Sequence, residues 1–387
     1  MDDENIDRVY VHIPFCGTKC GYCAFHSLAS PNESLIMSYL ERLREEISCC
    51  AYKLMPLKSL YIGGGTPSFL QEIYLEKLFD ILGNFKFAKD VEISIECNPE
   101  SLTESKIKLI SSFANRVSIG VQSFNKAHRK TIDRRGEADN LETILALFVE
   151  NRISNISCDL IYGIPSQSLE SFKSDLTRLI SLPIKHFSAY SMIIEENSRL
   201  NSVFSDREIE EADEVSAEIW DTIPALAKAA GFSRYEISNY SKTSFECLHN
   251  YAIWFGAKYI GFGPSASSFD GKIRWTNPEF NEWLIRRQPL IDDISYPQRV
   301  FEIMAMGLRT AEAWHFKIRA DGKVEIESRF GIVFCLDEFY WRRLLEKINS
   351  LSDKKLLILE GSLQEGLTVK SSEMGLNFWN DLAIEII

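Results

Sequence analysis

The amino-acid sequence predicts an α/β protein whose larger part is a parallel sheet covered by helices. Short apolar runs with the composition of strands alternate along the chain with longer amphipathic stretches of helical length. This alternation is typical of parallel βα units, in which each helix returns the chain to the same end of the sheet. The order of the elements by itself does not say whether such a sheet closes into a barrel.

Each predicted element is justified by its own residue pattern. Strands rich in β-branched and aromatic residues are expected at 8–13 (RVYVHI), 59–62, 91–96 (VEISIE), 116–121 (RVSIGV), 156–162 (ISCDLIY) and 186–192 (HFSAYSM). Helices are expected between them at 33–50, 71–82, 104–113, 141–150 and 169–182. Residues 206–231 have helical periodicity with charges on one face, and 232–240 have the pattern of another strand.

The composition changes near residues 277–292, where stretches rich in aromatic and charged residues begin that favour helices. A chain of 387 residues with 45% hydrophobic residues is long enough for two or three domains of about 150 residues each. We therefore expect two domains, one over residues 1–277 and a smaller one over residues 278–387.

The charge and the cysteine content argue against several classes of protein. A net charge of -12 disfavours nucleic acid as the main partner, because binding phosphates requires clustered lysine and arginine. The acidic start of the chain and the lack of any run of about 18 apolar residues argue against a secretion signal and a membrane span. We therefore expect a cytoplasmic protein, in which nine cysteines stay reduced and some of them bind metal.

Cys16, Cys20 and Cys23 form a C-x3-C-x2-C motif within the segment YVHIPFCGTKCGYCAF. Three thiolates on one short loop can each bind one iron of a 4Fe-4S cluster and leave the fourth iron open. The alternative is zinc, which usually takes four ligands in two separated pairs. A second cysteine pair is lacking, but His12 and His26 could complete a zinc site, so the spacing alone leaves both metals open.

Further motifs follow the later strands. The segment GGGTPS begins at Gly63, and its glycines let the backbone approach a ligand closely. Polar residues stand at the ends of the next predicted strands. Together with the cysteine motif, these segments resemble the radical S-adenosylmethionine (radical SAM) superfamily. Over nearly its whole length the chain resembles the branch that contains anaerobic coproporphyrinogen III oxidase and the heme chaperone HemW.

The resemblance implies a partial (β/α)6 radical SAM barrel followed by a small C-terminal helical or winged-helix-like domain. The cofactors would lie at the carboxyl ends of the strands, as ligands do in other α/β proteins. Cys16, Cys20 and Cys23 would hold the 4Fe-4S cluster, and S-adenosylmethionine would bind the open iron. In the family the cluster passes an electron to the sulfonium and a 5'-deoxyadenosyl radical results, which implies an electron donor as a partner.

The resemblance also assigns residues to S-adenosylmethionine, position by position. These are Tyr10, Tyr22, Gly64, Gly65, Thr66, Glu96, Gln122, Arg134 and Asp159. Among them Tyr22 would lie beside the adenine, the glycine loop would bind the methionine amino group, and Glu96 would bind the ribose hydroxyls. Arg135 directly follows Arg134, which leaves two candidates for the arginine. Taken singly, such polar residues are more often ordinary surface or ion-pairing groups.

Two departures separate the chain from the oxidase side of this branch. The oxidase carries a further cysteine two residues after the third ligand, where this chain has Phe25. The oxidase also has a long N-terminal extension, whereas only nine residues precede Tyr10 here. Both differences favour the HemW-like side of the branch.

HemW-like proteins carry an HNxxYW segment that is associated with heme binding, and CLHNYAIW matches it in part. His249 is the candidate axial ligand of heme iron, with Cys247 two residues upstream. Ile253 stands where the tyrosine is expected, and Pro264 and Ser267 replace the usual cysteine and histidine of the following loop. The alternative is that His249 forms only a hydrogen bond at a strand-to-helix corner.

We therefore predict a HemW-type protein that binds a 4Fe-4S cluster, S-adenosylmethionine and heme, and that delivers heme to acceptor proteins. The first alternative is an oxygen-independent coproporphyrinogen III oxidase of porphyrin biosynthesis, and the second is a heme-degrading radical SAM methyltransferase. Whether the chain is an enzyme stays open, but we expect no turnover of coproporphyrinogen III. The acidic composition counts against nucleic acid as a partner of the winged-helix-like part.

Overall fold

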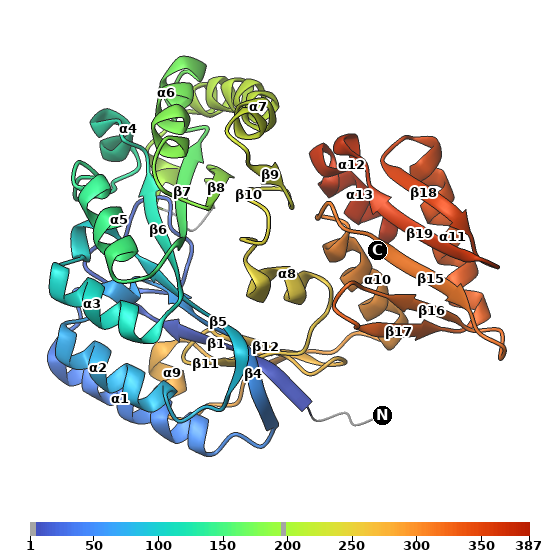
Figure 1. Cartoon of the computed structure of the whole chain (residues 1–387), viewed down its shortest axis with the longest axis horizontal. Coiled ribbons are helices and arrows are strands. Elements are labelled where there is room, and N and C mark those ends of the chain that lie inside the picture. The colour runs from blue at the N-terminus through green and yellow to red at the C-terminus, as the bar shows by residue number, and fades with distance from the viewer. Residues whose placement is uncertain (1–4, 195–198) are drawn as a thin grey trace.

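The computed structural model describes residues 5–194 and 199–387, and its larger part is one open sheet with the helices that cover it (Figure 1). The nine strands of this sheet follow the order β11-β1-β4-β5-β6-β7-β8-β10-β9. Neighbouring strands from β11 to β8 are parallel, whereas β10 and β9 are antiparallel at one edge. Within the described residues the two edge strands do not pair with each other, so the sheet is a partial barrel, as expected.

The predicted strands and helices of the barrel are confirmed, with shifts at their ends. The strands are β1 (Asn5–Ile13), β4 (Lys53–Gly64), β5 (Phe87–Cys97), β6 (Arg116–Gln122), β7 (Asn155–Tyr162) and β8 (His186–Ser191). The edge strand β11 (Ile260–Phe262) is not predicted from the sequence. The helices are α1 (Glu33–Ser48), α2 (Glu72–Leu82), α3 (Glu104–Phe113), α5 (Leu141–Glu150), α6 (Leu169–Ile180) and α7 (Asp206–Ala229). Across residues 5–194 and 199–387, every helix is too short or too polar to span a membrane.

One short helix of the barrel, α4 (Lys126–Thr131), is not predicted from the sequence. It has only six residues and no apolar stripe, so periodicity does not indicate it. Its signal is Asn125, whose side chain accepts hydrogen bonds from the N–H groups of Ala127 and His128 as an N-cap.

Along each strand, side chains alternate between the outer helices and the interior of the barrel. In β1, Val9, Val11 and Ile13 are fully buried in the apolar core, while Tyr10 and His12 take the inward positions. The inward positions of the other strands are also mostly polar: Ser59, Tyr61, Glu92, Ser94, Glu96, Arg116, Ser118, Ser157, Asp159, His186 and Ser188. The barrel therefore has a polar interior inside an apolar shell.

Helix α8 (Leu248–Trp254) closes the amino-terminal end of this interior. The backbone N–H groups of Leu248 and His249 donate to the Glu92 carboxylate at 3.0 and 3.1 Å. Glu92 thereby satisfies donors that a helix N-terminus leaves unpaired, and its charge suits the partial positive charge there. The buried guanidinium of Arg116 lies in the same cluster and offsets the charge of the carboxylate.

The single strand predicted over residues 232–240 is wrong. The structure has two short antiparallel strands there, β9 (Ser233–Arg234) and β10 (Asn239–Ser241). The connection between them is held by Glu236, which is completely buried, accepts from the Ser238 N–H at 2.9 Å and pairs with Arg309 at 3.0 Å. A buried carboxylate needs hydrogen-bond donors, and the turn of the chain that brings the Ser238 N–H to Glu236 interrupts the strand.

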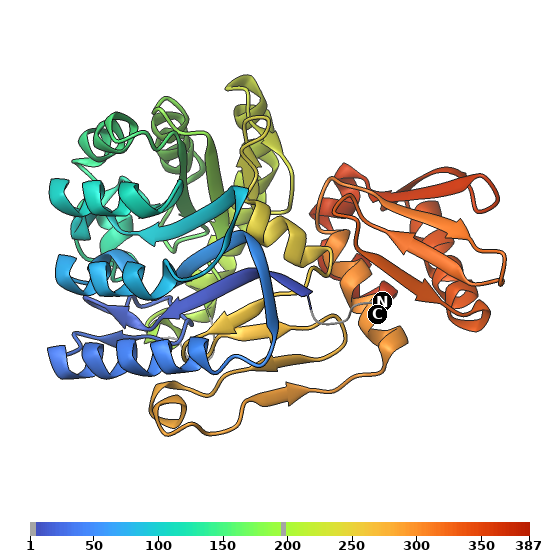
Figure 2. The ribbon, with the colours of Figure 1, turned by 60° about the horizontal axis from the view of Figure 1, so that its bottom comes forward.

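The C-terminal part contains more strand than the sequence predicts, and the expectation of a mainly helical region is wrong. It holds a five-stranded antiparallel sheet, β17-β16-β15-β19-β18, which lies beside the barrel in Figures 1 and 2. Its elements are α10 (Tyr296–Gly307), β15 (Trp314–Ile318), β16 (Val324–Glu327), β17 (Val333–Leu336), α11 (Glu338–Asp353), β18 (Leu357–Ser362), β19 (Gly366–Ser371), α12 (Glu373–Asn377) and α13 (Trp379–Ile386). Strands β15 and β16 alternate apolar with polar or charged residues (WHFKI and VEIE), a strand pattern that the overall composition of the region does not reveal.

The barrel and the C-terminal sheet have separate hydrophobic cores, and α8 joins them. Tyr251 and Phe255, on and just after α8, pack into the second core, where Phe255 lies 4.8 Å from Trp314 between ring centroids. A small sheet of β12 (Ser267–Phe269), β13 (Arg274–Thr276) and β14 (Leu290–Asp292) spans residue 277, and α9 (Phe280–Leu284) packs on the barrel core. The division into residues 1–277 and 278–387 stays a prediction.

Replacing Glu92 by alanine should lower the free energy of unfolding by about 2 to 5 kcal/mol, because it leaves the N–H groups of Leu248 and His249 at the α8 N-terminus without their acceptor. Glu92→Gln keeps one oxygen acceptor and should lose less. Urea unfolding followed by circular dichroism measures both. Glu150→Ala, which removes an exposed carboxylate from the end of α5, is the matched control and should stay within about 0.5 kcal/mol of the wild type. A Glu92→Ala protein as stable as this control would contradict the role of Glu92.

Candidate functional site

A cavity of about 330 Å³ lies at the carboxyl ends of the barrel strands, next to the cysteine loop. The parallel strands end at one edge, so residues far apart in the sequence meet there. The lining contains every cysteine of the motif and every residue assigned to S-adenosylmethionine except Tyr10: Cys16, Cys20, Cys23, Tyr22, Gly64, Gly65, Thr66, Glu96, Gln122, Arg134 and Asp159. The sequence assignments, made one at a time, therefore converge on one cavity.

Backbone and histidine hydrogen bonds close the cysteine loop. Strand β2 (Phe15–Cys16) pairs with β3 (Leu28–Ala29), so the chain enters and leaves the loop side by side. His12 Nε2 donates to the His26 carbonyl at 2.9 Å, and His12 Nδ1 accepts from the Tyr10 hydroxyl at 3.0 Å. Burial lowers the pKa of His12 to about 4, and the ring is therefore neutral. His26 Nε2 accepts the first N–H of α9 at 3.2 Å. Both ring nitrogens of His12 and one of His26 are thus engaged in hydrogen bonds within the fold.

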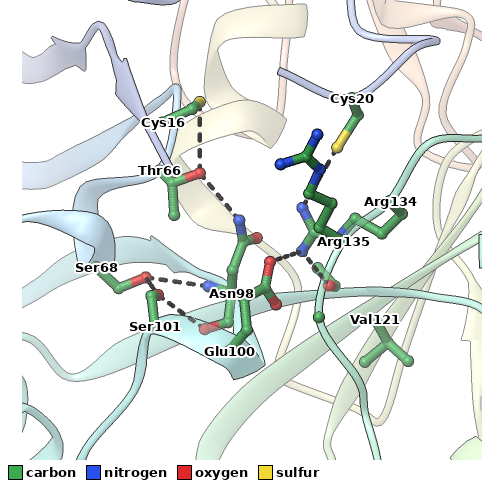
Figure 3. Close-up of polar contacts among 12 residues, drawn as sticks. Cys16, Cys20, Thr66, Ser68, Asn98, Glu100, Ser101, Val121, Arg134 and Arg135 are labelled. Carbon is green, nitrogen blue, oxygen red and sulfur yellow. Dashed lines mark hydrogen bonds and ion pairs between the residues drawn. The ribbon is translucent and has the colours of Figure 1, made fainter. Parts of the chain in front are cut away.

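Two of the three cysteine sulfurs accept hydrogen bonds from neighbouring elements (Figure 3). Thr66 Oγ1 donates to Cys16 Sγ at 3.6 Å, and Arg134 donates to Cys20 Sγ at 3.7 Å. Burial raises the pKa of the Cys16 and Cys23 thiols, so bound metal would have to stabilise their thiolates. A cubane needs each thiolate on a different iron. Among the described residues, no three His, Cys, Asp or Glu side chains converge on a single metal ion.

The glycine loop after β4 packs directly on the start of the cysteine loop. The N–H groups of Gly65 and Thr66 donate to the carbonyls of Ile13 and Phe15, each at 2.7 Å. A Cβ on Gly65 would lie 2.7 Å from the Phe15 carbonyl oxygen, which is backbone and cannot move aside. Gly64 has a φ of 107°, which other residues rarely adopt. The glycines are therefore required by the close approach of two loops, in addition to any approach to a ligand.

Glu96 and Asp159 bring two carboxylates to the cavity. Glu96 accepts from the Tyr61 hydroxyl at 2.8 Å and from the Gly64 N–H at 3.0 Å, and Asp159 accepts from Ser118 at 3.2 Å. Burial raises the pKa of both groups, that of Glu96 to about 7, and the charge of Asp159 adds to the rise at Glu96. Two carboxylates in one partly desolvated cavity favour a cationic ligand.

Arg134 and Gln122 line the opposite side of the cavity. Arg134 is held by the Gly120 carbonyl at 2.9 Å and by Glu100 at 3.4 Å while it donates to Cys20 (Figure 3). Arg135 is exposed and lies outside the cavity, so the structure separates the two candidate arginines. Gln122 has a φ of 69°, a left-handed conformation that turns the chain at the end of β6.

Tyr10 is the assigned residue that does not line the cavity. It pairs in register with Tyr61 on the neighbouring strand, with its ring 6.2 Å from that of Tyr61 between centroids, and its hydroxyl donates to His12. Tyr61 lines the cavity in its place and is missed by the sequence analysis, although its inward position two residues before Gly63 could have revealed it. Other polar lining residues that the sequence analysis misses include Asn98, Ser118, Tyr190 and Lys19.

His249 lies on the barrel floor, away from the cofactor cavity. Its side chain is 2% exposed, and its Nδ1 is 2.8 Å from the Ser59 hydroxyl. Burial lowers the pKa of His249 to about 3, so the ring is neutral. His249 is thus buried and hydrogen-bonded at a strand-to-helix corner. This is the alternative to heme ligation that the sequence analysis leaves open.

Comparison with known proteins agrees with this geometry. Residues 10–179 match the radical SAM superfamily. The chain is 29% identical to the heme chaperone HemW of Lactococcus lactis subsp. lactis (strain IL1403), over 98% of both chains. It is 33% identical to the heme chaperone HemW of Bacillus subtilis (strain 168), over 69% of this chain and 72% of that protein. It is also 33% identical to the heme chaperone HemW of Escherichia coli (strain K12), over 67% and 68%.

Among solved structures, the fold is similar to that of the coproporphyrinogen III oxidase HemN from Escherichia coli, a radical SAM enzyme. The TM-score is 0.78 over 99% of this chain and 90% of the oxidase. The two sequences are 20% identical, so this similarity concerns the fold alone.

Anaerobic reconstitution of the purified protein should give about four irons and four sulfides per chain, with broad thiolate-to-iron absorption. Alanine at Cys16, Cys20 or Cys23 should abolish this absorption, because each thiolate supplies one cluster ligand. Cys49→Ala, which removes an exposed cysteine at the end of α1, is the control and should leave it unchanged. Stoichiometric zinc without sulfide in the purified protein would contradict the cluster.

The affinity for S-adenosylmethionine should depend on Glu96. Loss of a charge-assisted hydrogen bond costs about 1.5 to 3 kcal/mol, so Glu96→Ala or Asp159→Ala should weaken binding roughly ten- to a hundredfold. Below pH 7 Glu96 is protonated and loses its charge, so wild-type affinity should fall by up to about tenfold from pH 8 to pH 6.

Isothermal titration calorimetry across this pH range provides the measurement. In Glu96→Gln the carboxylate is gone, so the part of the pH dependence that Glu96 supplies should disappear. Equal pH profiles for wild type and Glu96→Gln would exclude Glu96 as a ligand of the cofactor.

Proposed function

We propose that this chain, which belongs to the HemW family of radical SAM proteins, is a cytoplasmic heme chaperone that binds heme and passes it to acceptor proteins. The observation that carries the proposal is the similarity to a heme chaperone HemW over 98% of both chains. Phe25 supports the same side of the branch. Its side chain is 68% exposed and lines the cofactor cavity at the position where the oxidase pattern has a cysteine.

The cofactor cavity fits the two cofactors of this family. Cys16, Cys20 and Cys23 would hold a 4Fe-4S cluster, and Thr66 and Arg134 would donate hydrogen bonds to two of its sulfur ligands. When both cofactors are bound, the cluster supplies the electron that cleaves the sulfonium of S-adenosylmethionine.

The residues around the cluster loop bind and orient the second cofactor. Glu96 would bind the ribose hydroxyls, and the hydrogen bonds from Tyr61 and Gly64 keep it in place. The charges of Glu96 and Asp159 would also attract the cationic sulfonium and amino groups from a distance. Tyr22, half-buried against Ile132 and Leu200, contributes an apolar wall that would exclude water from the adenine.

Heme ligation by His249 is the part of the proposal that requires movement. Ser59 bonds to Nδ1 of His249, and the ring is buried with its centroid 5.4 Å from that of Tyr61, so neither nitrogen is open to a heme. The imidazole can reach heme iron only after the first turn of α8 leaves the barrel floor. We propose that heme binding at His249 and release of this turn are coupled, so that removing the Ser59 hydroxyl would favour the heme-bound arrangement.

The purified protein should bind about one heme per chain and should not convert coproporphyrinogen III, even with its cluster intact and reduced. Spectroscopic heme titration and anaerobic incubation with coproporphyrinogen III, S-adenosylmethionine and a reductant measure the two halves. His249→Ala should change the heme spectrum, and Ser59→Ala should strengthen binding, because it frees the imidazole.

The outcomes distinguish the parts of the proposal. Release of carbon dioxide and formation of protoporphyrinogen IX would make the chain an oxidase and would reject the chaperone. An unaltered heme spectrum in His249→Ala would move the ligand elsewhere and leave the chaperone in place, with Cys247 as the next candidate. Failure to bind heme at all would reject the chaperone.

A further inference from the structure

The surface outside the cysteine loop is basic, although the chain as a whole has a net charge of -12. A pocket of about 270 Å³ next to this loop is lined by residues from α4 and the turn that follows it. Its charged residues are the cations Lys126, Arg129, Lys130, Arg134 and Arg135 and the carboxylates Asp133 and Glu137. This concentration of positive charge in an acidic protein requires an explanation.

Most of these charges are already paired within the fold. The buried guanidinium of Arg129 donates to backbone carbonyls such as that of Gly136, and Arg134 is held by Cys20, Gly120 and Glu100. Lys126 pairs with Glu137 at 2.9 Å and with Asp139 at 3.1 Å. Asp133 pairs with Arg199.

Two exposed cations of this pocket remain, Lys130 and Arg135, and Lys19 on the cysteine loop is a third exposed cation. We call Lys19, Lys130 and Arg135 the basic rim. In the part of the chain that the structure describes, the side chains of these three residues form no ion pair. The rim is continuous around the cysteine loop. Lys130 and Arg135 line the same pocket, Arg135 shares a second groove of about 480 Å³ with Thr18, and Thr18 and Lys19 line the cofactor cavity.

The basic rim lies directly beside the cysteines that would bind the cluster. Lys19 directly precedes Cys20, and Arg135 directly follows Arg134, which donates to the Cys20 sulfur at 3.7 Å (Figure 3). Phe25, two residues after Cys23, adds an exposed aromatic ring at the edge of the same cavity. A partner that contacts these residues would approach the cluster loop from outside the barrel, at the edge of the cofactor cavity.

We infer that the basic rim docks an acidic one-electron carrier protein, of the flavin or iron-sulfur type, that reduces the cluster. The carrier would lose one electron, and the cluster would pass from the 2+ to the 1+ state, so no bond is formed and no proton is required. Opposite charges across such a contact speed association and position the partner, and the unpaired cations are the groups available for it. The inference rests on the cluster of the proposed function and is independent of heme.

The test uses the reconstituted full chain and the hydroquinone form of an acidic flavodoxin, which gives one electron. Cluster reduction is followed by anaerobic stopped-flow absorption. The rim variant K19E/K130E/R135E should lower the second-order rate constant by about tenfold or more at low ionic strength. The wild-type rate constant should fall as salt is added, and that of the rim variant should not.

The matched control is K53E/K86E/K89E. It introduces the same change of charge with three exposed lysines at the amino-terminal ends of β4 and β5, opposite to the cluster loop. Its rate constant should stay within about twofold of the wild type, because screening weakens charges at that distance. Iron and sulfide content and reduction by methyl viologen radical, a small cation, should be preserved in all three proteins.

Each outcome decides a separate question. A rim variant that is reduced as fast as the wild type, or a control that slows equally, would overturn the docking surface. A wild-type rate that does not depend on salt would overturn it without any variant. Failure of the wild type to assemble a reducible cluster would instead overturn the cluster assignment of the proposed function.

Discussion

The contact between the end of β1 and the glycine loop after β4 is the constraint on which the site depends. Two backbone hydrogen bonds of 2.7 Å join them, and the space beside Gly65 admits no side chain. Because β1 and β4 are parallel neighbours, both loops leave the sheet at the same end. Thr66 then donates a hydrogen bond to Cys16. Asn98, which directly follows β5, donates to the Thr66 hydroxyl at 2.9 Å. One backbone contact thus places the cysteine loop, the glycine loop and the next strand together.

A polar barrel interior imposes a second requirement, since buried polar groups need partners. His186 is held between Ser157 at 2.7 Å and the Tyr235 hydroxyl at 2.9 Å, and Glu92 receives the first N–H groups of α8. Helix α8 therefore completes the barrel floor with its first turn and the second hydrophobic core with its last. The position of His249 follows from this double role, because the residue belongs to the turn that seals the barrel.

Charge is distributed differently inside and outside the cysteine loop. The cavity carries the carboxylates of Glu96 and Asp159, which suit a cationic cofactor, whereas the outer surface carries the basic rim. Arg134 stands between the two, since it faces the cysteine sulfur inside while its neighbour Arg135 faces solvent. The order of residues in one short turn thus separates cofactor binding from contact with a partner.

Much of the barrel and of its cavity is determined by the sequence itself. Apolar residues in a strand indicate which of its side chains are buried, and the cysteine spacing and the glycine run are requirements of single loops. Both kinds of pattern lie within short segments and can be recognised from the sequence. Tertiary structure alone decided which inward side chain reaches the cavity. Tyr10 and Tyr61 are partners in register, but the hydroxyl of Tyr10 meets His12, whereas that of Tyr61 meets Glu96. Tertiary structure also decided that Glu236 interrupts a strand and that His249 faces the barrel floor. These outcomes depend on partners distant in the sequence, such as Arg309 and Ser59, and local residue patterns carry no information about such partners.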